Sequence, residues 1–132
     1  MAKKNGNGRP KDPMSNTKTM ANEGMRLIRN IAFGNFNMYN DGHVFRDITF
    51  VNATIAEVDK RLFDAQVHVN AMAYAYGSCE DPRVVALRFN DQKRVDAYML
   101  IRETLSSIAA TGGDTGFLLN LVNKLPKYKY NI

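Results

Sequence analysis

The chain has no tryptophan, a single cysteine (Cys79) and only four prolines among its 132 residues. One cysteine cannot form a disulfide within the chain, which favours a reducing, intracellular compartment. No run of about 18 apolar residues is present, and the basic start is followed by polar residues instead of the apolar stretch of a secretory signal. We therefore expect a cytoplasmic protein, or a virion-associated one if it is viral, that does not contact membranes.

Residue patterns typical of catalysis or metal binding are also scarce. His43 and His68 have no second histidine or carboxylate at the spacing of metal ligands, and Cys79 precedes two carboxylates that oppose thiolate formation. The glycine-rich segment 112–116 lacks the lysine and the preceding strand of a phosphate-binding loop. The sequence predicts a protein that is not an enzyme, with no metal, no cofactor and no small-molecule substrate.

Against these absences stands one strong pattern, an apolar residue at alternating steps of four and three from residue 44 to residue 76. This spacing predicts one stripe of a helix about 50 Å long. Several β-branched residues early in the segment make a strand over residues 44–51 the competing prediction. The stripe consists of Val44, Ile48, Val51, Ile55, Val58, Leu62, Ala65, Val69, Met72 and Tyr76.

A second long helix is predicted over residues 82–110. Gly77 ends the first helix, and Asp81 followed by Pro82 is a typical helix start. A connection this short makes the two helices antiparallel neighbours. Asp91 falls where the second stripe needs an apolar residue, so a break at Asn90–Asp91 and a continuous helix both stay open.

Two shorter helices flank this hairpin. The first is expected to begin near Thr19 or Asn22 and to end about Phe33, because Gly34 favours a C-terminal stop. The last is expected over residues 116–125, with Thr115 as its N-cap and Pro126 as its end.

The predicted fold class is therefore all-α, a helical bundle built on a long antiparallel αα-hairpin. We divide the chain into a flexible basic arm (1–19), a helical domain (20–125) and a short basic and aromatic tail (126–132). Breakers and missing apolar periodicity in the first segment support this division.

Large apolar residues also lie off the seam of the first long helix, and the short helices cannot cover a 50 Å rod on every side. We expect them to form the interface of a homo-oligomer, while a monomeric bundle that absorbs them is the alternative. The interface residues predicted in this way are Phe45, Phe50, Phe63 and Tyr74.

The net charge of +5 is concentrated at the two ends. Residues 1–19 have five basic side chains and one acidic one, residues 20–123 have ten and twelve, and residues 124–132 have three and none. Basic ends on a mildly acidic body favour contact with an anionic partner such as nucleic acid. The residues predicted to bind it are Lys3, Lys4, Arg9, Lys11, Lys18, Lys127 and Lys129.

Gly8-Arg9-Pro10 resembles part of an AT-hook, whose Arg-Gly-Arg-Pro core binds the minor groove of A·T-rich DNA. Asn7 occupies the position of the first arginine, so the resemblance covers only these few residues. It implies that Arg9 enters a narrow minor groove while the lysines contact phosphates.

Three functions follow as hypotheses. The first is a non-enzymatic, oligomeric helical protein that binds nucleic acid, in particular DNA, through its basic ends. The second is a structural or assembly subunit of a phage-type virus particle or another large complex. The third is an inhibitor or adaptor that binds one host protein through an exposed apolar face.

Overall fold

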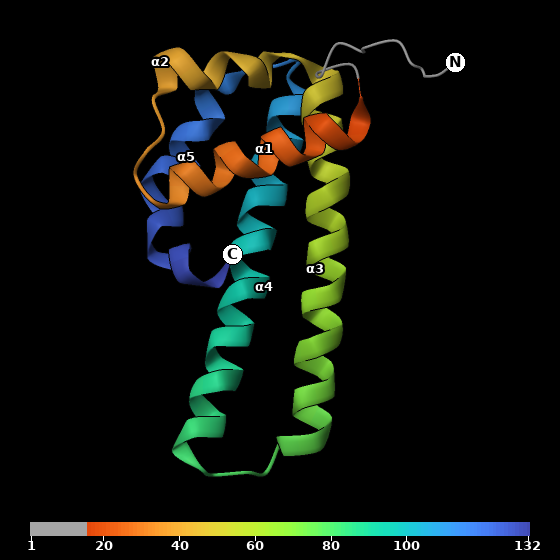
Figure 1. Cartoon of the computed structure of the whole chain (residues 1–132), viewed down its shortest axis with the longest axis vertical. Helices are drawn as coiled ribbons and strands as arrows, with labels where there is room; N and C mark the ends of the chain where they lie inside the picture. Colours follow the sequence, from red (N-terminus) through yellow and green to blue (C-terminus); the bar gives the residue numbers. More distant parts are fainter. Residues whose placement is uncertain (1–15) are drawn as a thin grey trace, which may run out of the picture.

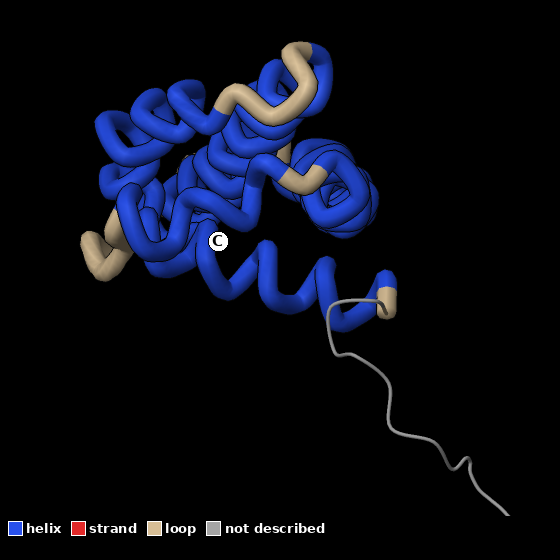
Figure 2. Tube along the Cα trace, turned by 90° about the horizontal axis from the view of Figure 1, so that it is seen from above, coloured by secondary structure: helices blue, strands red, loops and turns tan. Residues whose placement is uncertain are grey.

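The computed structural model describes residues 16–132, and this part of the chain contains helices and no strand (Figures 1 and 2). The predicted all-α fold class is confirmed. In chain order the elements are α1 (Thr17–Ala32), α2 (Met38–Asp41), the 3-10 helix η2 (Gly42–Arg46), α3 (Ile48–Tyr76), α4 (Pro82–Ala110), the 3-10 helix η3 (Thr115–Phe117), α5 (Leu118–Lys124) and the 3-10 helix η4 (Leu125–Asn131).

The two long helices, α3 and α4, form the predicted antiparallel hairpin (Figure 1). The Asp81 carboxylate accepts a hydrogen bond from the Arg83 backbone N–H at 2.9 Å, and Pro82 occupies the first turn of α4. Helix α4 continues through Asn90 without a break. The interruption of its apolar stripe has a tertiary cause, because the Asp91 carboxylate contacts His68 Nε2 of α3 at 3.0 Å.

The first turn of the predicted long helix is absent. Residues Gly42–Arg46 form η2, and α3 begins only at Ile48, after Asp47 accepts a hydrogen bond from the Thr49 N–H at 2.9 Å. The alternative of a strand over residues 44–51 is likewise wrong. A capping carboxylate at residue 47 therefore decides where the helix begins, against an apolar periodicity that starts at Val44.

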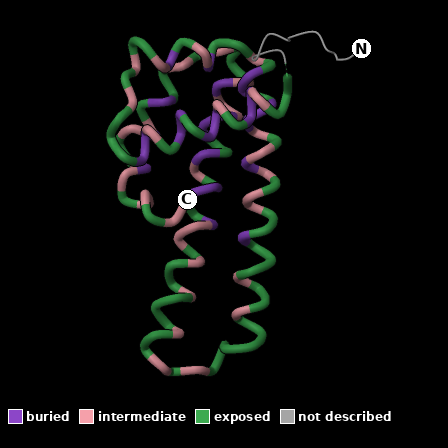
Figure 3. The backbone as a smooth tube through the Cα atoms, viewed as in Figure 1, coloured by how far each residue is buried: buried purple, intermediate pink, exposed green. Residues whose placement is uncertain are grey.

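The core lies at one end of the molecule, which we call the hub. It comprises the short helices, residues 48–65 of α3 and residues 95–110 of α4, and α1 packs across α3 there (Figure 1). No residue between Gln66 and Arg94 is buried, so this part, the distal hairpin, projects from the hub (Figure 3). The largest fully buried side chains are Phe45, Phe50, Ile28, Ile101, Leu105, Ile108, Leu118, Leu121, Leu125, Val51, Val58 and Val95.

Two of the predicted interface residues belong to this core. Phe45 and Phe50 are 0% and 1% exposed, and their rings meet edge to face with centroids 5.4 Å apart. Their assignment to an oligomer interface is therefore wrong. The 3-10 turn before α3 points Phe45 inward, and Phe50 lies on the side of α3 that the hub covers.

Helix α1 approaches α3 closely at Gly24. A Cβ atom at this position would lie 2.8 Å from Thr54 Cγ2 and closer still to the Thr54 hydroxyl oxygen. The Thr54 side chain is itself fully buried, and its hydroxyl donates to the Phe50 carbonyl at 2.9 Å. Only a glycine allows the two helices this separation.

Both ends of α1 differ a little from prediction. The helix begins at Thr17, because the Asn16 side chain accepts a hydrogen bond from the Thr19 N–H at 3.1 Å, so Thr19 and Asn22 are not its caps. Its C-terminal end is as expected, with Phe33 as C-cap and Gly34 in the left-handed region at φ +78°. Lys18, assigned to the basic arm, therefore lies in the first helical turn.

The C-terminal segment is also more ordered than expected. Asp114, and not Thr115, caps the helical turn at η3, where its carboxylate accepts from the Gly116 N–H at 3.0 Å. Residues 125–131 continue from α5 as η4, so Pro126 does not end the helical structure. Arg94 Nε donates to the Asn131 carbonyl at 2.9 Å and holds this predicted tail against α4.

Candidate functional site

The basic residues predicted to bind nucleic acid fall into two groups. Lys3, Lys4, Arg9 and Lys11 lie outside the described residues, as does the segment resembling an AT-hook. Lys18 lies at the start of α1, and Lys127 and Lys129 lie in η4. The two described groups are at opposite ends of α1, because the ring of Tyr130 contacts Phe33 edge to face with centroids 6.0 Å apart.

Between these ends, α1 presents a basic outer face that the sequence analysis missed. Its exposed residues recur at steps of four and three, as expected for one side of a helix whose other side is buried. The face carries three cations, while its acidic neighbour Glu23 is paired with one of them. We define the outer face of α1 by Lys18, Asn22, Arg26, Arg29 and Phe33.

The Arg26–Glu23 pair leaves Lys18 and Arg29 as the cations available on this face. Arg26 Nη2 lies 2.6 Å from the Glu23 carboxylate, and this hydrogen bond holds the pKa of Glu23 below its ordinary value. No ion pair within residues 16–132 involves Lys18 or Arg29. Both side chains can therefore bind an anion without first breaking an ion pair with a carboxylate of the described residues.

The far end of the outer face is aromatic as well as basic. Tyr130 is 81% exposed, and the Lys129 ammonium lies 5.1 Å from the centre of its ring. In the same way Lys127 lies 5.1 Å from the ring centre of Tyr128. Tyr128 is partly buried against the core, so Tyr130 is the ring of this pair that is open to stack with a base while the cations contact phosphates.

A second group of cations and rings forms where η4 meets α4. Lys127 and Tyr128 share a hollow of about 270 Å³ with Phe89 and Lys93, which the sequence separates from them by more than thirty positions. The Lys93 ammonium lies 4.7 Å from the centre of the Phe89 ring. Asp96 also lines this hollow, so the charge there is mixed, unlike that of the outer face of α1.

The two long helices carry the other unusual surface, which is apolar and extends from the distal hairpin to exposed residues of the hub. On α3, Phe63, Val67 and Tyr74 are exposed at helical spacing, with Tyr74 95% exposed. On α4, Val85, Phe89 and Met99 are exposed on a different side. The two remaining interface residues, Phe63 and Tyr74, thus lie at the surface, as an interface requires.

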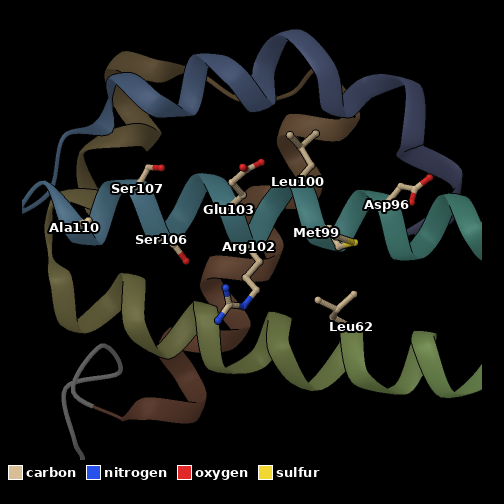
Figure 4. A pocket seen from close by; sticks show the side chains of 9 residues that line it. All are labelled: Leu62, Asp96, Met99, Leu100, Arg102, Glu103, Ser106, Ser107 and Ala110. Atoms are coloured by element: carbon tan, nitrogen blue, oxygen red, sulfur yellow. The ribbon is translucent and has the colours of Figure 1, made fainter.

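Two grooves run between α3 and α4 on the side of α4 that faces away from the hub. The larger, of about 870 Å³, is lined by Leu62 of α3 and by α4 residues from Asp96 to Ala110 (Figure 4). The smaller, of about 250 Å³, lies nearer the tip and is lined by Val69, Met72 and α4 residues from Val85 to Gln92. We call this side of α4 its open face, defined by Val85, Phe89, Gln92, Asp96, Met99, Glu103 and Ala110.

Residues able to do chemistry are dispersed. Among residues 16–132 no group of three His, Cys, Asp or Glu side chains lies close enough to hold a metal ion. His68 contacts Asp91 across the hairpin, while Cys79 lies in the connection between the long helices. Within the same residues, no helix combines the length and the apolar character needed to cross a membrane.

Comparison with known proteins adds no relative from which a function could be carried over. The chain matches no protein-family model, no curated protein and no solved structure.

Proposed function

We propose that this chain is a non-enzymatic, oligomeric helical protein that binds nucleic acid, and duplex DNA in particular, through its basic ends and the outer face of α1. The observation that carries this proposal is the position of the basic residues along one side of α1. Lys18 and Arg29 lie on one exposed side of α1, between the basic segment before the helix and the lysines of η4.

The dimensions of α1 suit this partner. A helix of 16 residues is about 24 Å long, and the phosphates of one DNA strand recur about every 3.4 Å along the duplex axis. The outer face is therefore about as long as a duplex segment of seven base pairs. The basic residues before Asn16 would extend the contact past one end of α1, and Lys129 with Tyr130 would extend it past the other.

The salt dependence of DNA affinity tests the proposal on the described residues. Replacing both Lys18 and Arg29 by glutamine is expected to reduce the slope of log affinity against log salt by about 2, because each lost cation releases about 0.9 counterion fewer. The matched control is Lys60→Gln, which neutralises an exposed lysine on α3 and is expected to leave the slope unchanged.

Deleting residues 1–15 tests the basic segment. This deletion retains Asn16, the cap of α1, and removes Lys3, Lys4, Arg9 and Lys11. The shortened chain neutralises about four phosphates fewer. The slope of log affinity against log salt is therefore expected to fall by about 3 to 4, and most binding at moderate salt is expected to be lost. Affinity that neither the deletion nor the double substitution changes would refute this function.

A structural or assembly role is the second candidate, and the exposed apolar residues of the distal hairpin favour it. Monomeric proteins rarely expose large contiguous apolar patches, and here no residue from Gln66 to Arg94 is buried. In this alternative the hairpin holds a neighbouring subunit and the basic segment contacts protein. Higher-order self-association that is insensitive to salt, in protein without DNA affinity, would favour it over DNA binding.

A further inference from the structure

We infer that a second copy of this chain packs antiparallel on the open face of α4, so that two hairpins form a two-fold symmetric dimer. This inference rests on the oligomeric part of the proposed function and identifies its partner. It does not depend on DNA binding.

Most of the open face lacks a partner within its own chain, and only its middle part borders η4, at the hollow that Phe89 and Asp96 share with Lys127 and Tyr128. The side of α4 that faces the hub is buried and includes Ala97, Tyr98, Ile101, Leu105 and Ile108. The open face lies about half a helical turn away from them, and Met99 on it is 55% exposed. Along this face the two grooves place apolar side chains of α3 and α4 within reach of a partner.

Charge is distributed unevenly along this face. The groove nearer the hub is lined by Asp96 and Glu103. The groove nearer the tip is lined by Arg88 and by Asp91, whose carboxylate is paired with His68 of α3. Arg102 also lines the groove nearer the hub, but its guanidinium is paired with Asp59 of α3. Each open face is therefore acidic at one end and basic at the other.

Two copies can pair symmetrically through this face with their α4 helices either parallel or antiparallel, and only the antiparallel pair brings opposite charges together. A parallel pair would place Glu103 near Glu103 and Arg88 near Arg88 of the two copies. An antiparallel pair, with its two-fold axis midway between Gln92 and Asp96, places the Arg88 end of each copy beside the Glu103 end of the other. A two-fold interface repeats this contact, so the charge complementarity counts twice.

The apolar residues follow the same symmetry. In this register Phe89 of each copy lies opposite Met99 of the other, so that an exposed ring meets an exposed thioether, a favourable pairing. The shared strip spans about 24 residues of α4, or about 36 Å. With the adjoining side chains of α3 it would bury roughly 500–700 Å² per copy, near the lower bound for a stable specific interface.

Charge reversal with complementation tests this arrangement in protein free of nucleic acid. Arg88→Glu and Glu103→Arg are each expected to weaken the homodimer about tenfold at low salt, because each creates two like-charge contacts. Mixed in equal amounts, the two variants are expected to form a heterodimer with affinity near that of the unmodified chain, since both contacts then pair opposite charges. Analytical ultracentrifugation of each variant and of the mixture measures this.

Arg83→Glu is the matched control. Arg83 lies outside the open face, paired with Asp81 at the start of α4, so its reversal is expected to leave dimer affinity unchanged. Circular dichroism checks that each variant is folded. A wild-type chain that stays monomeric, or variants that fail to complement each other, would overturn the inference, while DNA affinity measured separately reports on the proposed function.

Discussion

Replacing Gly24 by alanine is expected to lower the free energy of unfolding, although alanine is the better helix former. The added methyl group would lie 2.8 Å from Thr54 Cγ2 and closer to the hydroxyl oxygen. Thr54 has no room to yield, because it is fully buried and its hydroxyl is bonded to the Phe50 carbonyl. Helix α1 must therefore shift away from α3 and loosen the centre of the hub.

The net effect follows from two opposing contributions. Overpacking a well-packed core destabilises by about 1–3 kcal/mol, whereas Gly→Ala within a helix stabilises by about 1 kcal/mol. Because the added Cβ would overlap several Thr54 atoms, the overpacking cost is expected in the upper part of that range, about 2–3 kcal/mol, which leaves a net loss of about 1–2 kcal/mol. For a domain of this size, that loss lowers the melting temperature by about 3–10 °C.

Denaturant unfolding followed by circular dichroism measures the loss, and a double-mutant cycle tests its cause. Thr54→Ala removes the two nearest atoms, so the double variant is expected to be about 1 kcal/mol more stable than the sum of the single effects predicts. Gly34→Ala is the control, because a Cβ at Gly34 meets nothing within 4 Å and its strain comes from φ +78°. Its effect is expected to add to that of Thr54→Ala. A Gly24→Ala variant as stable as the original chain, or an absence of coupling, would refute the steric explanation.

Two further stability predictions follow from burial and from capping. Phe45→Ala is expected to destabilise the fold by about 3–5 kcal/mol, because it empties a fully buried site. Phe63 is 69% exposed, so Phe63→Ala is expected to change stability by less than about 0.5 kcal/mol. Thermal unfolding at low protein concentration compares the two variants. The Arg83 side chain, and then its backbone N–H, hold the pKa of Asp81 below its ordinary value of 3.8. The charge of Asp81 therefore stabilises the fold above that value and ceases to do so as the pH falls through the lowered pKa. Asp81→Asn retains a capping side chain without the charge, so its deficit relative to the original chain is expected at neutral pH and should vanish in strong acid. A deficit that is constant across a pH series of denaturant unfolding would contradict this assignment.

Local rules accounted for several element boundaries. Asp81–Pro82 starts α4, Gly34 follows the end of α1, and a five-residue connection makes the long helices antiparallel. Each boundary depends on atoms within a few residues of chain, which is why sequence spacing is enough to predict it. The errors at Asn16 and Asp47 are of the same local kind, because each of these caps lies beside a plausible alternative.

Part of the candidate site was equally accessible from sequence and was overlooked. Lys18, Asn22, Arg26 and Arg29 follow helical spacing, so the outer face of α1 could have been predicted once the helix was assigned. The meeting of Lys127 with Phe89 and Lys93 could not, because it requires η4 to fold back on α4. No short-range pattern encodes that contact.

Sequence patterns were enough to predict the four main helices α1, α3, α4 and α5, their order, and the concentration of positive charge at the two ends. Which apolar residues remain at the surface depends instead on the packing of distant segments. Phe45 and Phe63 are the same residue type in neighbouring parts of the chain, yet one is fully buried and the other is 69% exposed. The difference depends on where the other elements of the hub lie, since they cover Phe45 but leave uncovered the side of α3 on which Phe63 lies, and they leave the distal hairpin without a buried residue. Burial depends on packing between distant segments, and for that reason only the folded chain shows which surfaces are left for a partner.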